Sequence, residues 1–583
     1  MYYTSEENVQ ILIALLKKHN VSKIIASPGT MNISFVGSVQ TDNYFTIYSA
    51  PDERSAAYMA CGLAKECNEP VVITCTGATA SRNYIPGLTE AFYSKIPIIS
   101  VTFSQPFAYI GQNRPQVMDR RTQLNDMCIK SVQIPVCRSP EDIWATDLMI
   151  NDALLAATSN ASGPVHINIV SECSTDFSIK KLPNVRKIDK FTMDKEFPPL
   201  PKGRIGIYVG AHNKWTKNLI KVVDKFCELN NSVVFCDRTG NYEGKYAIYP
   251  SLVCSQDSYI SSLRSLDLLI YIGNVFGTDM VMNPSQVWRV NPDGVVRDTF
   301  GNLSAVFETT EEVFFSKYIE MTKHNESNDE YYLQWNDEVI RFEKLIPELP
   351  YSNLWCAKTV IEKIPEQTTI HFGILNSLRC WSLMYLNKFT YGYSNTGGFG
   401  IDGCISTLIG ASLANSNQLY FGVIGDLAFF YDMNVLGNRH VGNNIRLMLV
   451  NNGKGTEFRM YNHPGNIFKE QADCYISAGN HYGCKSSRLV KNYAENLGFE
   501  YISAANKEEF IKNLKKFLSP YSSSSKSLIF EVFTTSEDES AALYKMRNLV
   551  VDNGAIAKNK IKKAAKNLLG ENVIKTVKKI IKK

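Results

Sequence analysis

The sequence lacks any long hydrophobic run. Nowhere do about 18 apolar residues follow one another without a charged residue, which argues against a membrane-spanning helix. The N-terminus, MYYTSEENVQ, has neither a basic region nor an apolar stretch, so we expect no secretory signal. The fourteen cysteines form no C-x-x-C pair, which argues against structural zinc, and a disulfide framework is rare in so long a chain. These absences predict a folded cytoplasmic protein with reduced thiols.

Negative charge is almost absent from the end of the chain. The whole sequence of 583 residues has a net charge of +5. Residues 553–583 hold ten lysines and one acid, Glu571, which gives this tail +9 and leaves −4 for the rest of the chain. The body is therefore mildly acidic, and the tail is strongly basic.

The basic tail has the pattern of an amphipathic helix. Apolar residues between Ile561 and Ile581 recur near helical spacing, with lysines mostly on the other face. Such a helix can lie on an anionic membrane surface, which would place the protein at the inner face of the membrane. A subunit-packing helix or a solvated tail fits the same pattern. Because no aromatic residues interleave with the lysines, we predict no nucleic-acid partner.

Short apolar runs alternate with helical patterns along most of the chain, which is typical of buried parallel strands separated by helices. They predict an α/β protein with three consecutive doubly wound parallel-sheet domains, over residues 1–180, 200–335 and 350–545, before the tail at 553–583. The polar stretch 180–202 is the expected linker between the first two domains. The candidate strands are SKIIAS, FTIYSA, PVVITCT, IPIISVTF, GPVHINIV, RIGIYVGA, SVVFCD, LDLLIYIGN, TTIHFGI, LYFGVIGD, IRLMLVNN and SLIFEVFT.

Two polar pairs follow neighbouring candidate strands. Gly425-Asp426 comes directly after LYFGVI, and Asn451-Asn452 ends the next run, 26 residues from Asp426 to Asn452. That spacing suits a strand, a helix and a return strand, which places both residues at the carboxyl edge of one parallel sheet, where ligands bind. An Asp carboxylate, an Asn amide oxygen and a nearby carbonyl are the hard oxygen ligands that Mg²⁺ requires. The same residues also occur in ordinary turns and loops.

This pattern resembles the signature of the thiamine diphosphate enzymes, in which Gly-Asp is followed some two dozen residues later by Asn or Asn-Asn. The resemblance implies that Asp426 and Asn452 bind Mg²⁺ and that Lys454 offers a backbone carbonyl. It also implies that Glu53, in the stretch PDERSAA, bonds the aminopyrimidine ring of the cofactor and exchanges the proton that activates it. A glutamate at a helix start can instead simply favour the helix N-terminus electrostatically.

Three further motifs occur in the order that this family has. Thr76-Gly77, after PVVITC, resembles the lining of the pyrimidine pocket. Asn376-Ser377, after TTIHFGI, resembles a turn that contacts the diphosphate. Gly400-Ile401, before ISTLIGASLA, carries the apolar residue that wedges between the two cofactor rings in this family. The resemblance implies pyrimidine-binding, central transhydrogenase-like and diphosphate-binding domains of the thiamine diphosphate enzyme type. It also implies thiamine diphosphate and Mg²⁺ as cofactors, and a homodimer or homotetramer with sites between subunits.

Within the superfamily the chain most resembles the SEPHCHC synthases, the menaquinone-pathway family that joins 2-oxoglutarate to isochorismate. The matching stretches are DERSAAYMACGLAK, TGATASRNYIPGLTEA, GIDGCISTLIGASLA and GDLAFFYDMNVL. Three arginines of that family are missing, because Met31, Gln105 and Thr396 stand in their places. A bidentate arginine–carboxylate pair is not replaced by these side chains. We therefore expect a substrate with fewer carboxylates.

The function that we predict is decarboxylation of a 2-oxo acid and transfer of the acyl carbanion to an acceptor, such as a sugar aldehyde in cell-surface glycan synthesis. Two alternatives stay open. One is a SEPHCHC synthase with a rewired pocket, and the other is a catalytically silent scaffold that binds the cofactor. The candidate substrate contacts are Thr30, Gln116, Arg379, Asn395, Arg459 and His463.

Deletion of residues 553–583 tests the membrane hypothesis. If the lysines of the tail bind an anionic surface, the full chain floats with vesicles that contain anionic lipid and the shortened chain does not. Neutral vesicles serve as the control. Equal flotation of the two proteins would contradict a membrane role for the tail.

Overall fold

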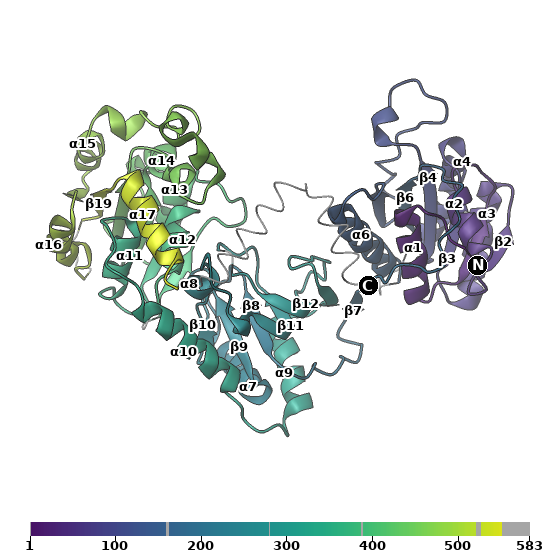
Figure 1. The fold of residues 1–583 in the computed structure, drawn as a ribbon, viewed down its shortest axis with the longest axis horizontal. Helices are drawn as coiled ribbons and strands as arrows, with labels where there is room; N and C mark the ends of the chain where they lie inside the picture. The colour runs from purple at the N-terminus through teal and green to yellow at the C-terminus, as the bar shows by residue number, and fades with distance from the viewer. Residues whose placement is uncertain (1, 159–162, 279, 386–388, 521–525, 551–583) are drawn as a thin grey trace. The chain divides into compact units, whose positions relative to one another are not determined.

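The computed structural model describes residues 2–158, 163–278, 280–385, 389–520 and 526–550 (Figure 1). It contains three parallel β-sheets of six to seven strands, each accompanied by helices, which confirms the predicted α/β fold class. Two compact units are defined by the contacts. The first comprises Met1–Phe197 with Val287–Thr309, and the second comprises Pro198–Gln286 with Thr310–Lys583. The predicted basic tail lies outside the described residues.

The first unit is built on a six-stranded parallel sheet with the order β2-β1-β3-β4-β6-β5. Strands β3 and β6 are buried at every position, as expected for a sheet covered on both faces. One hydrophobic cluster contains residues of α1, α2 and α6, and another contains residues of α3 and α5. The elements are α1 (Glu7–Lys18), β1 (Lys23–Ala26), α2 (Ile33–Val39), β2 (Thr46–Ser49), α3 (Glu53–Cys67), β3 (Val71–Cys75), α4 (Ala78–Asn83), α5 (Ile85–Tyr93), β4 (Ile98–Ser104), η1 (Phe107–Tyr109), β5 (Lys130–Ile134), α6 (Pro140–Thr158) and β6 (Val165–Val170).

The stretch expected to be only a linker contributes a strand to the first unit. Strand β7 (Asp189–Phe191) pairs in parallel with β13 (Leu303–Phe307), which also pairs with β12 (Asn283–Val290) from Val287 onward. The rings of Phe191 and Phe307 stack with their centroids 5.0 Å apart. The linker prediction therefore missed a short strand, because its pairing depends on a segment more than a hundred residues away.

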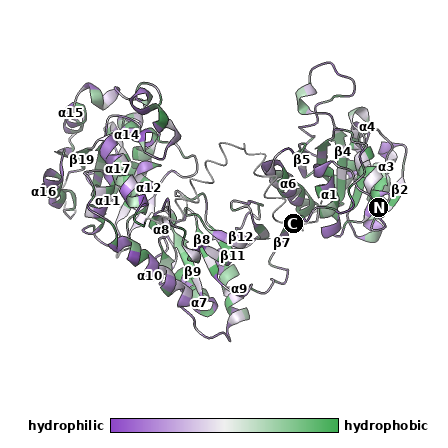
Figure 2. Ribbon diagram, in the orientation of Figure 1, coloured by the Kyte–Doolittle hydropathy of each residue, from purple (hydrophilic) through white to green (hydrophobic). Residues whose placement is uncertain are grey.

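The second unit begins with the parallel strands β10-β9-β8-β11. The central strands β8 and β9 are fully buried and strongly hydrophobic (Figure 2). Helix α7 packs on α9, and α10 packs on α8. The elements are β8 (Ile205–Val209), α7 (Lys217–Asn230), β9 (Ser232–Cys236), β10 (Ala247–Ile248), α8 (Ser251–Cys254), η2 (Ser262–Arg264), β11 (Ser265–Ile272), α9 (Glu311–Thr322) and α10 (Glu330–Lys344).

The rest of the second unit holds a six-stranded parallel sheet with the order β15-β14-β16-β17-β19-β18. Strands β14, β16 and β17 are neighbours, so the loops that follow them meet at one carboxyl edge. The elements are α11 (Asn353–Ile361), β14 (Thr369–Phe372), α12 (Asn376–Ser382), β15 (Tyr391–Tyr393), α13 (Cys404–Ser412), β16 (Tyr420–Gly425), α14 (Asp426–Asp432), η3 (Met433–Gly437), β17 (Ile445–Asn451), η4 (Thr456–Arg459), η5 (Pro464–Ala472), η6 (Tyr482–Lys485), α15 (Leu489–Asn496), β18 (Glu500–Ala504), α16 (Lys507–Phe517), β19 (Leu528–Phe533) and α17 (Ser536–Arg547).

Every predicted apolar run coincides with a strand to within one or two residues at each end. The described residues include no helix that is both long and apolar enough to cross a membrane.

Candidate functional site

The carboxyl edge of β14, β16 and β17 opens into a cavity of about 240 Å³ in the second unit. Seven residues that the sequence predicted for the cofactor and the metal line this one cavity. They are Asn376, Ser377, Ile401, Gly425, Asp426, Asn452 and Lys454. Gly400 precedes Ile401 in the chain and is not part of the lining.

Asp426 and Asn452 offer two buried oxygen acceptors to this cavity. The Asp426 side chain is 5% exposed, and its Oδ1 accepts one hydrogen bond from the backbone N–H of Leu427 at 2.9 Å. Burial raises the pKa of Asp426 to about 7. The Oδ1 atom of Asn452 is buried and accepts no hydrogen bond. A buried carboxylate beside an amide oxygen that lacks a donor fits a cation such as Mg²⁺.

The loop after β17 is held from outside the cavity by an acidic residue. The ammonium group of Lys454 lies 2.6 Å from a carboxylate oxygen of Asp473, and Arg459 lies 2.5 Å from the other oxygen. Although burial opposes the change, these two hydrogen bonds hold the pKa of Asp473 below its usual range. The backbone carbonyl of Lys454, predicted as a metal ligand, accepts the N–H of Thr456 at 2.8 Å.

A hydrogen-bonded chain behind the cavity fixes the same loop, and the sequence did not predict it. The amide of Asn451 donates to Glu531 at 2.7 Å, and the hydroxyl of Tyr501 donates to the other Glu531 oxygen at 2.6 Å. The Asn451 oxygen in turn accepts the N–H of Gly453 at 3.2 Å. Gly453 has φ +76°, a backbone conformation that favours glycine. The chain of bonds therefore sets the path of the residues that carry Asn452.

Two further carboxylates line the cavity without having been predicted. Glu539 of α17 is 2% exposed, and its Oε1 accepts from Thr534 at 2.7 Å and from the N–H of Asn353 at 2.9 Å. Burial raises the pKa of Glu539 to about 7. Glu457 lies at the other side of the loop and pairs with Arg379. Neither glutamate belongs to a recognisable sequence motif, so their place in the site depends on the fold.

Glu53 and the predicted pyrimidine-pocket residues lie in the first unit. Glu53 starts α3, where Asp52 caps the helix by accepting the N–H of Ser55 at 2.8 Å. The half-buried Glu53 carboxylate accepts a hydrogen bond from Asn83 at 3.1 Å. Since Asp52 performs the capping, Glu53 has its carboxylate directed to another side chain.

Thr76 and Gly77 follow β3 and lie against the loop after β1. A side chain in place of Gly29 would approach the Thr76 Cβ to 2.3 Å, so the two loops pack without room for another atom. The Thr76 hydroxyl accepts the N–H of Met31 at 3.3 Å. In the same unit, Thr30 and Gln116 are exposed, and Gln116 has φ +60°.

The remaining substrate candidates have partners within the chain. Arg379 pairs with Glu457 at 2.6 Å, and Arg459 pairs with Asp473. His463 precedes η5, and its Nδ1 accepts the N–H of Gly465 at 2.9 Å. Asn395 accepts a hydrogen bond from Thr407 at 3.1 Å. None of these four residues lines the cavity at the edge of β14, β16 and β17.

The buried Asp426 and the half-buried Asn452 line one cavity at the edge of a parallel sheet, which is the arrangement that the sequence predicted for a thiamine diphosphate-dependent α/β enzyme. Residues 7–124 match the family described as "Thiamine pyrophosphate enzyme, N-terminal TPP binding domain".

Similarity to known proteins extends over nearly the whole chain. A 2-succinyl-5-enolpyruvyl-6-hydroxy-3-cyclohexene-1-carboxylate (SEPHCHC) synthase from Bacteroides fragilis is 32% identical over 566 residues, covering 93% of this chain and 98% of that protein. Synthases of the same name from Phocaeicola vulgatus and Flavobacterium psychrophilum are 30% and 27% identical, with 93% and 92% of this chain and 98% and 97% of those proteins covered. The chain belongs to the thiamine pyrophosphate enzyme family and is a decarboxylase/carboligase of the SEPHCHC synthase type.

Glu539 gives a pH-dependent prediction. Its pKa is about 7 in the folded protein against an ordinary value of 4.5, so between these values the folded state keeps a proton that the unfolded chain has lost. The contribution of Glu539 to the free energy of unfolding therefore falls as pH rises from 4.5 to 7, and it is constant above this range. In Glu539→Gln the accepting Oε1 is kept and the charge is removed. The variant lacks this pH-dependent loss of stability. Relative to the wild type, its melting temperature should therefore be higher at pH 7 than at pH 4.5.

Thermal unfolding with thiamine diphosphate omitted, at closely spaced pH values, measures this difference. Glu508→Gln, at an exposed glutamate in the first turn of α16, is the matched control and should show no such trend. A constant difference between Glu539→Gln and the wild type would contradict the proposed titration.

Proposed function

We propose that the chain decarboxylates a 2-oxo acid and transfers the resulting acyl carbanion equivalent to an acceptor, with Mg²⁺ held beside thiamine diphosphate. The observation that carries the proposal is the cavity lined by Asp426 and Asn452, in a chain whose relatives over 93% of its length are SEPHCHC synthases. Similarity of this extent supports the substrates of those synthases as the first candidate: 2-oxoglutarate as donor and isochorismate as acceptor.

The residues of the chain have distinct roles in this proposal. The bound cofactor supplies the carbon nucleophile and the electron sink for decarboxylation. Asp426 and Asn452 hold Mg²⁺ through oxygen, and the Lys454 carbonyl adds a third ligand. Glu53 holds the pyrimidine ring and exchanges a proton with it. Ile401 keeps one wall of the cavity apolar, which limits access of water to the reacting atoms.

A second candidate is a carboligase whose substrates carry fewer carboxylates, such as one with a sugar aldehyde as acceptor in cell-surface glycan synthesis. The observation that favours it is the state of the predicted substrate arginines. Arg379 and Arg459 each pair with a carboxylate of the chain itself, at 2.6 Å and 2.5 Å. A guanidinium that is already paired offers less to the carboxylate of a substrate.

The quaternary arrangement is also a proposal. Glu53 belongs to the first unit and Asp426 to the second. We propose a cytoplasmic homo-oligomer in which each site combines the first unit of one subunit with the second unit of another, with the basic tail available for contact with a membrane surface.

Release of CO₂ from a panel of 2-oxo acids tests the reaction. With thiamine diphosphate and Mg²⁺ present, we expect one acid to be decarboxylated and the rate to increase when its acceptor is added. 2-Oxoglutarate with isochorismate is the first pair, and 2-oxoglutarate or pyruvate with sugar aldehydes is the second. Loss of Mg²⁺ to a chelator should abolish the release. No release from any acid by enzyme that binds the cofactor would overturn the proposed function.

Two inactive variants test the shared site. Glu53→Ala removes the proton-exchanging group and should lower turnover about 10²- to 10⁴-fold with folding intact. Asp426→Ala should abolish turnover by removing the metal ligand. Co-expressed, the two subunits should regain activity in mixed oligomers, because one of the combined sites is then unaltered. Absence of recovery in isolated mixed oligomers would show that each site lies within a single subunit.

A further inference from the structure

Two polar side chains in the lining of the cavity at the sheet edge belong to none of the predicted motifs. Thr456 lies in η4 and Glu539 in α17, and both line the cavity together with Asp426 and Asn452. Thr456 is 3% exposed and Glu539 is 2% exposed. The elements η4 and α17 pack on each other, so the two side chains come from adjoining parts of the cavity wall.

The hydroxyl group of Thr456 lacks a partner. Its Oγ1 atom is buried and makes no hydrogen bond with any residue that the structure describes. The backbone N–H of the same residue is already used, because it donates to the carbonyl of Lys454 at 2.8 Å. A buried hydroxyl without a partner is costly unless a ligand supplies one. A ligand of this cavity is therefore expected to offer Thr456 a hydrogen-bond partner.

The carboxyl group of Glu539 has one oxygen that is satisfied and one that is open. Oε1 accepts the hydroxyl of Thr534 at 2.7 Å and the N–H of Asn353, the first residue of α11, at 2.9 Å. No residue in the described part of the chain donates to Oε2. Burial raises the pKa of the group to about 7. Because Oε1 already accepts two bonds, the proton of the neutral acid belongs on Oε2, which makes this oxygen a donor.

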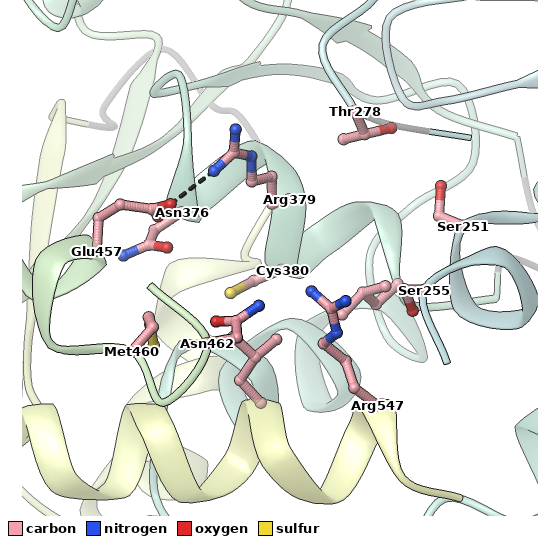
Figure 3. A pocket seen from close by; sticks show the side chains of 12 residues that line it. Ser251, Ser255, Thr278, Asn376, Arg379, Cys380, Glu457, Met460, Asn462 and Arg547 are labelled. Atoms are coloured by element: carbon pink, nitrogen blue, oxygen red, sulfur yellow. Dashed lines mark hydrogen bonds and ion pairs between the residues drawn. The ribbon is translucent and has the colours of Figure 1, made fainter. Parts of the chain in front are cut away.

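The other glutamate of the cavity wall is bonded differently. Arg379 donates from Nη1 to Oε1 of Glu457 at 2.6 Å, and the side-chain amide of Asn376 donates to the other oxygen. Figure 3 shows these three side chains grouped together at the side of a second cavity. Both oxygens of Glu457 thus have donors, and neither is free to carry a proton towards a ligand. Of the two glutamates, Glu539 is the one that can donate.

We propose that Thr456 and Glu539 bind the diphosphate of the cofactor, with the hydroxyl of Thr456 and the protonated Oε2 of Glu539 each donating to a phosphate oxygen. The proposal rests on the proposed thiamine diphosphate site and adds two binding residues to it. A phosphate oxygen is a charged acceptor, which is the partner that both donors lack. Its negative charge also opposes ionisation of the carboxyl group, since like charges in one dry site repel each other. Cofactor binding therefore keeps a proton on Glu539.

Titratable groups close to Glu539 come from α17, from α11 with the residue before its cap, and from α12. Asp538, the preceding residue of α17, favours the protonated form of Glu539 because two carboxylates repel each other. Burial raises the pKa of the others, which are therefore uncharged between pH 6 and pH 8. They are Tyr351, Cys356 and Cys380.

Charged groups on the other walls of the cavity are ion-paired or bind the metal. The ion-paired ones are Lys454 in the loop after β17 and Glu457 and Arg459 on η4. Asp426 has a pKa of about 7, and it gives up its proton when Mg²⁺ binds. That proton contributes equally in two proteins that differ only at Glu539. A comparison of two such proteins therefore isolates the proton of Glu539.

Calorimetry of cofactor binding in buffers of different ionisation enthalpy measures this proton directly. Thiamine diphosphate is titrated into the full-length protein with saturating Mg²⁺ at pH 8, where Glu539 is mostly ionised before binding. In Glu539→Gln the accepting oxygen is kept and the amide is a permanent donor. The wild type should take up close to one proton more per site than this variant. Its affinity should be about tenfold lower than that of the variant at pH 8 and similar to it at pH 6.

Further probes and variants separate the two contacts from general damage. Inorganic diphosphate with Mg²⁺ should show the same difference in proton uptake, and thiamine, which has no phosphate, should show none. Thr456→Val removes only a hydroxyl, so it should weaken binding of thiamine diphosphate several-fold at both pH values without changing proton uptake. Glu508→Gln, at an exposed glutamate of α16, is the control and should match the wild type.

The outcomes distinguish this proposal from the proposed function. Equal proton uptake by the wild type and Glu539→Gln, or wild-type affinity in Thr456→Val, would overturn the two contacts. A wild-type protein that binds no thiamine diphosphate would overturn them together with the cofactor site. The expected difference in proton uptake, without CO₂ release from any 2-oxo acid, would support the contacts and count against the decarboxylase function alone.

Discussion

Burial of the Asp426 carboxylate is the constraint on which the site depends. The side chain is 5% exposed at the end of a strand, and burial raises its pKa to about 7. A negative charge in such a place is costly unless a proton or a cation accompanies it. Asn452 lines the same cavity, and its buried Oδ1 atom accepts no hydrogen bond. A bound divalent cation would supply a partner to both oxygens.

The sheet places these two residues in the lining of one cavity. Strands β16 and β17 pair in register to their ends, with Gly425 opposite Val450. The next strand, β19, supplies the buried Glu531 that holds Asn451, and Asp473 holds Lys454 from the other side. The loop that carries Asn452 is thus fixed by buried polar bonds before any ligand arrives. Supporting bonds of this type orient the groups that contact a metal and reduce the cost of binding it.

The sequence predicts those parts of the fold that are marked by a pattern of neighbouring residues. Strand β17 is buried at all seven positions and is therefore recognisable as an apolar run in the sequence. The residues at the end of such a strand can be assigned to the edge of the sheet. Edge strands such as β5 and β18 have half-exposed, mixed sequences, so their pairing cannot be recognised without the neighbouring strand.

Side chains in the site show the same limit. Asp426 and Asn452 are predictable because a spacing along the chain fixes their separation in the sheet. The roles of Glu457 and Glu539 depend on contacts made from η4 and α17, which no spacing encodes. The sequence also does not predict that Arg459 pairs with Asp473, the residue that binds Lys454 as well.

Two cavities of the second unit share Asn376 and Glu457 in their linings. The cavity at the sheet edge is lined by Asp426 and by Asn452, whose Oδ1 has no hydrogen-bond donor. A neighbouring cavity of about 290 Å³ is lined by Arg379, Arg547 and Glu457, among others (Figure 3). Glu457 borders both spaces and is bonded to Asn376 and Arg379 on one helix. Because the same carboxylate borders both cavities and is bonded to Arg379, a change of its charge alters the electrostatic potential of the two cavities together.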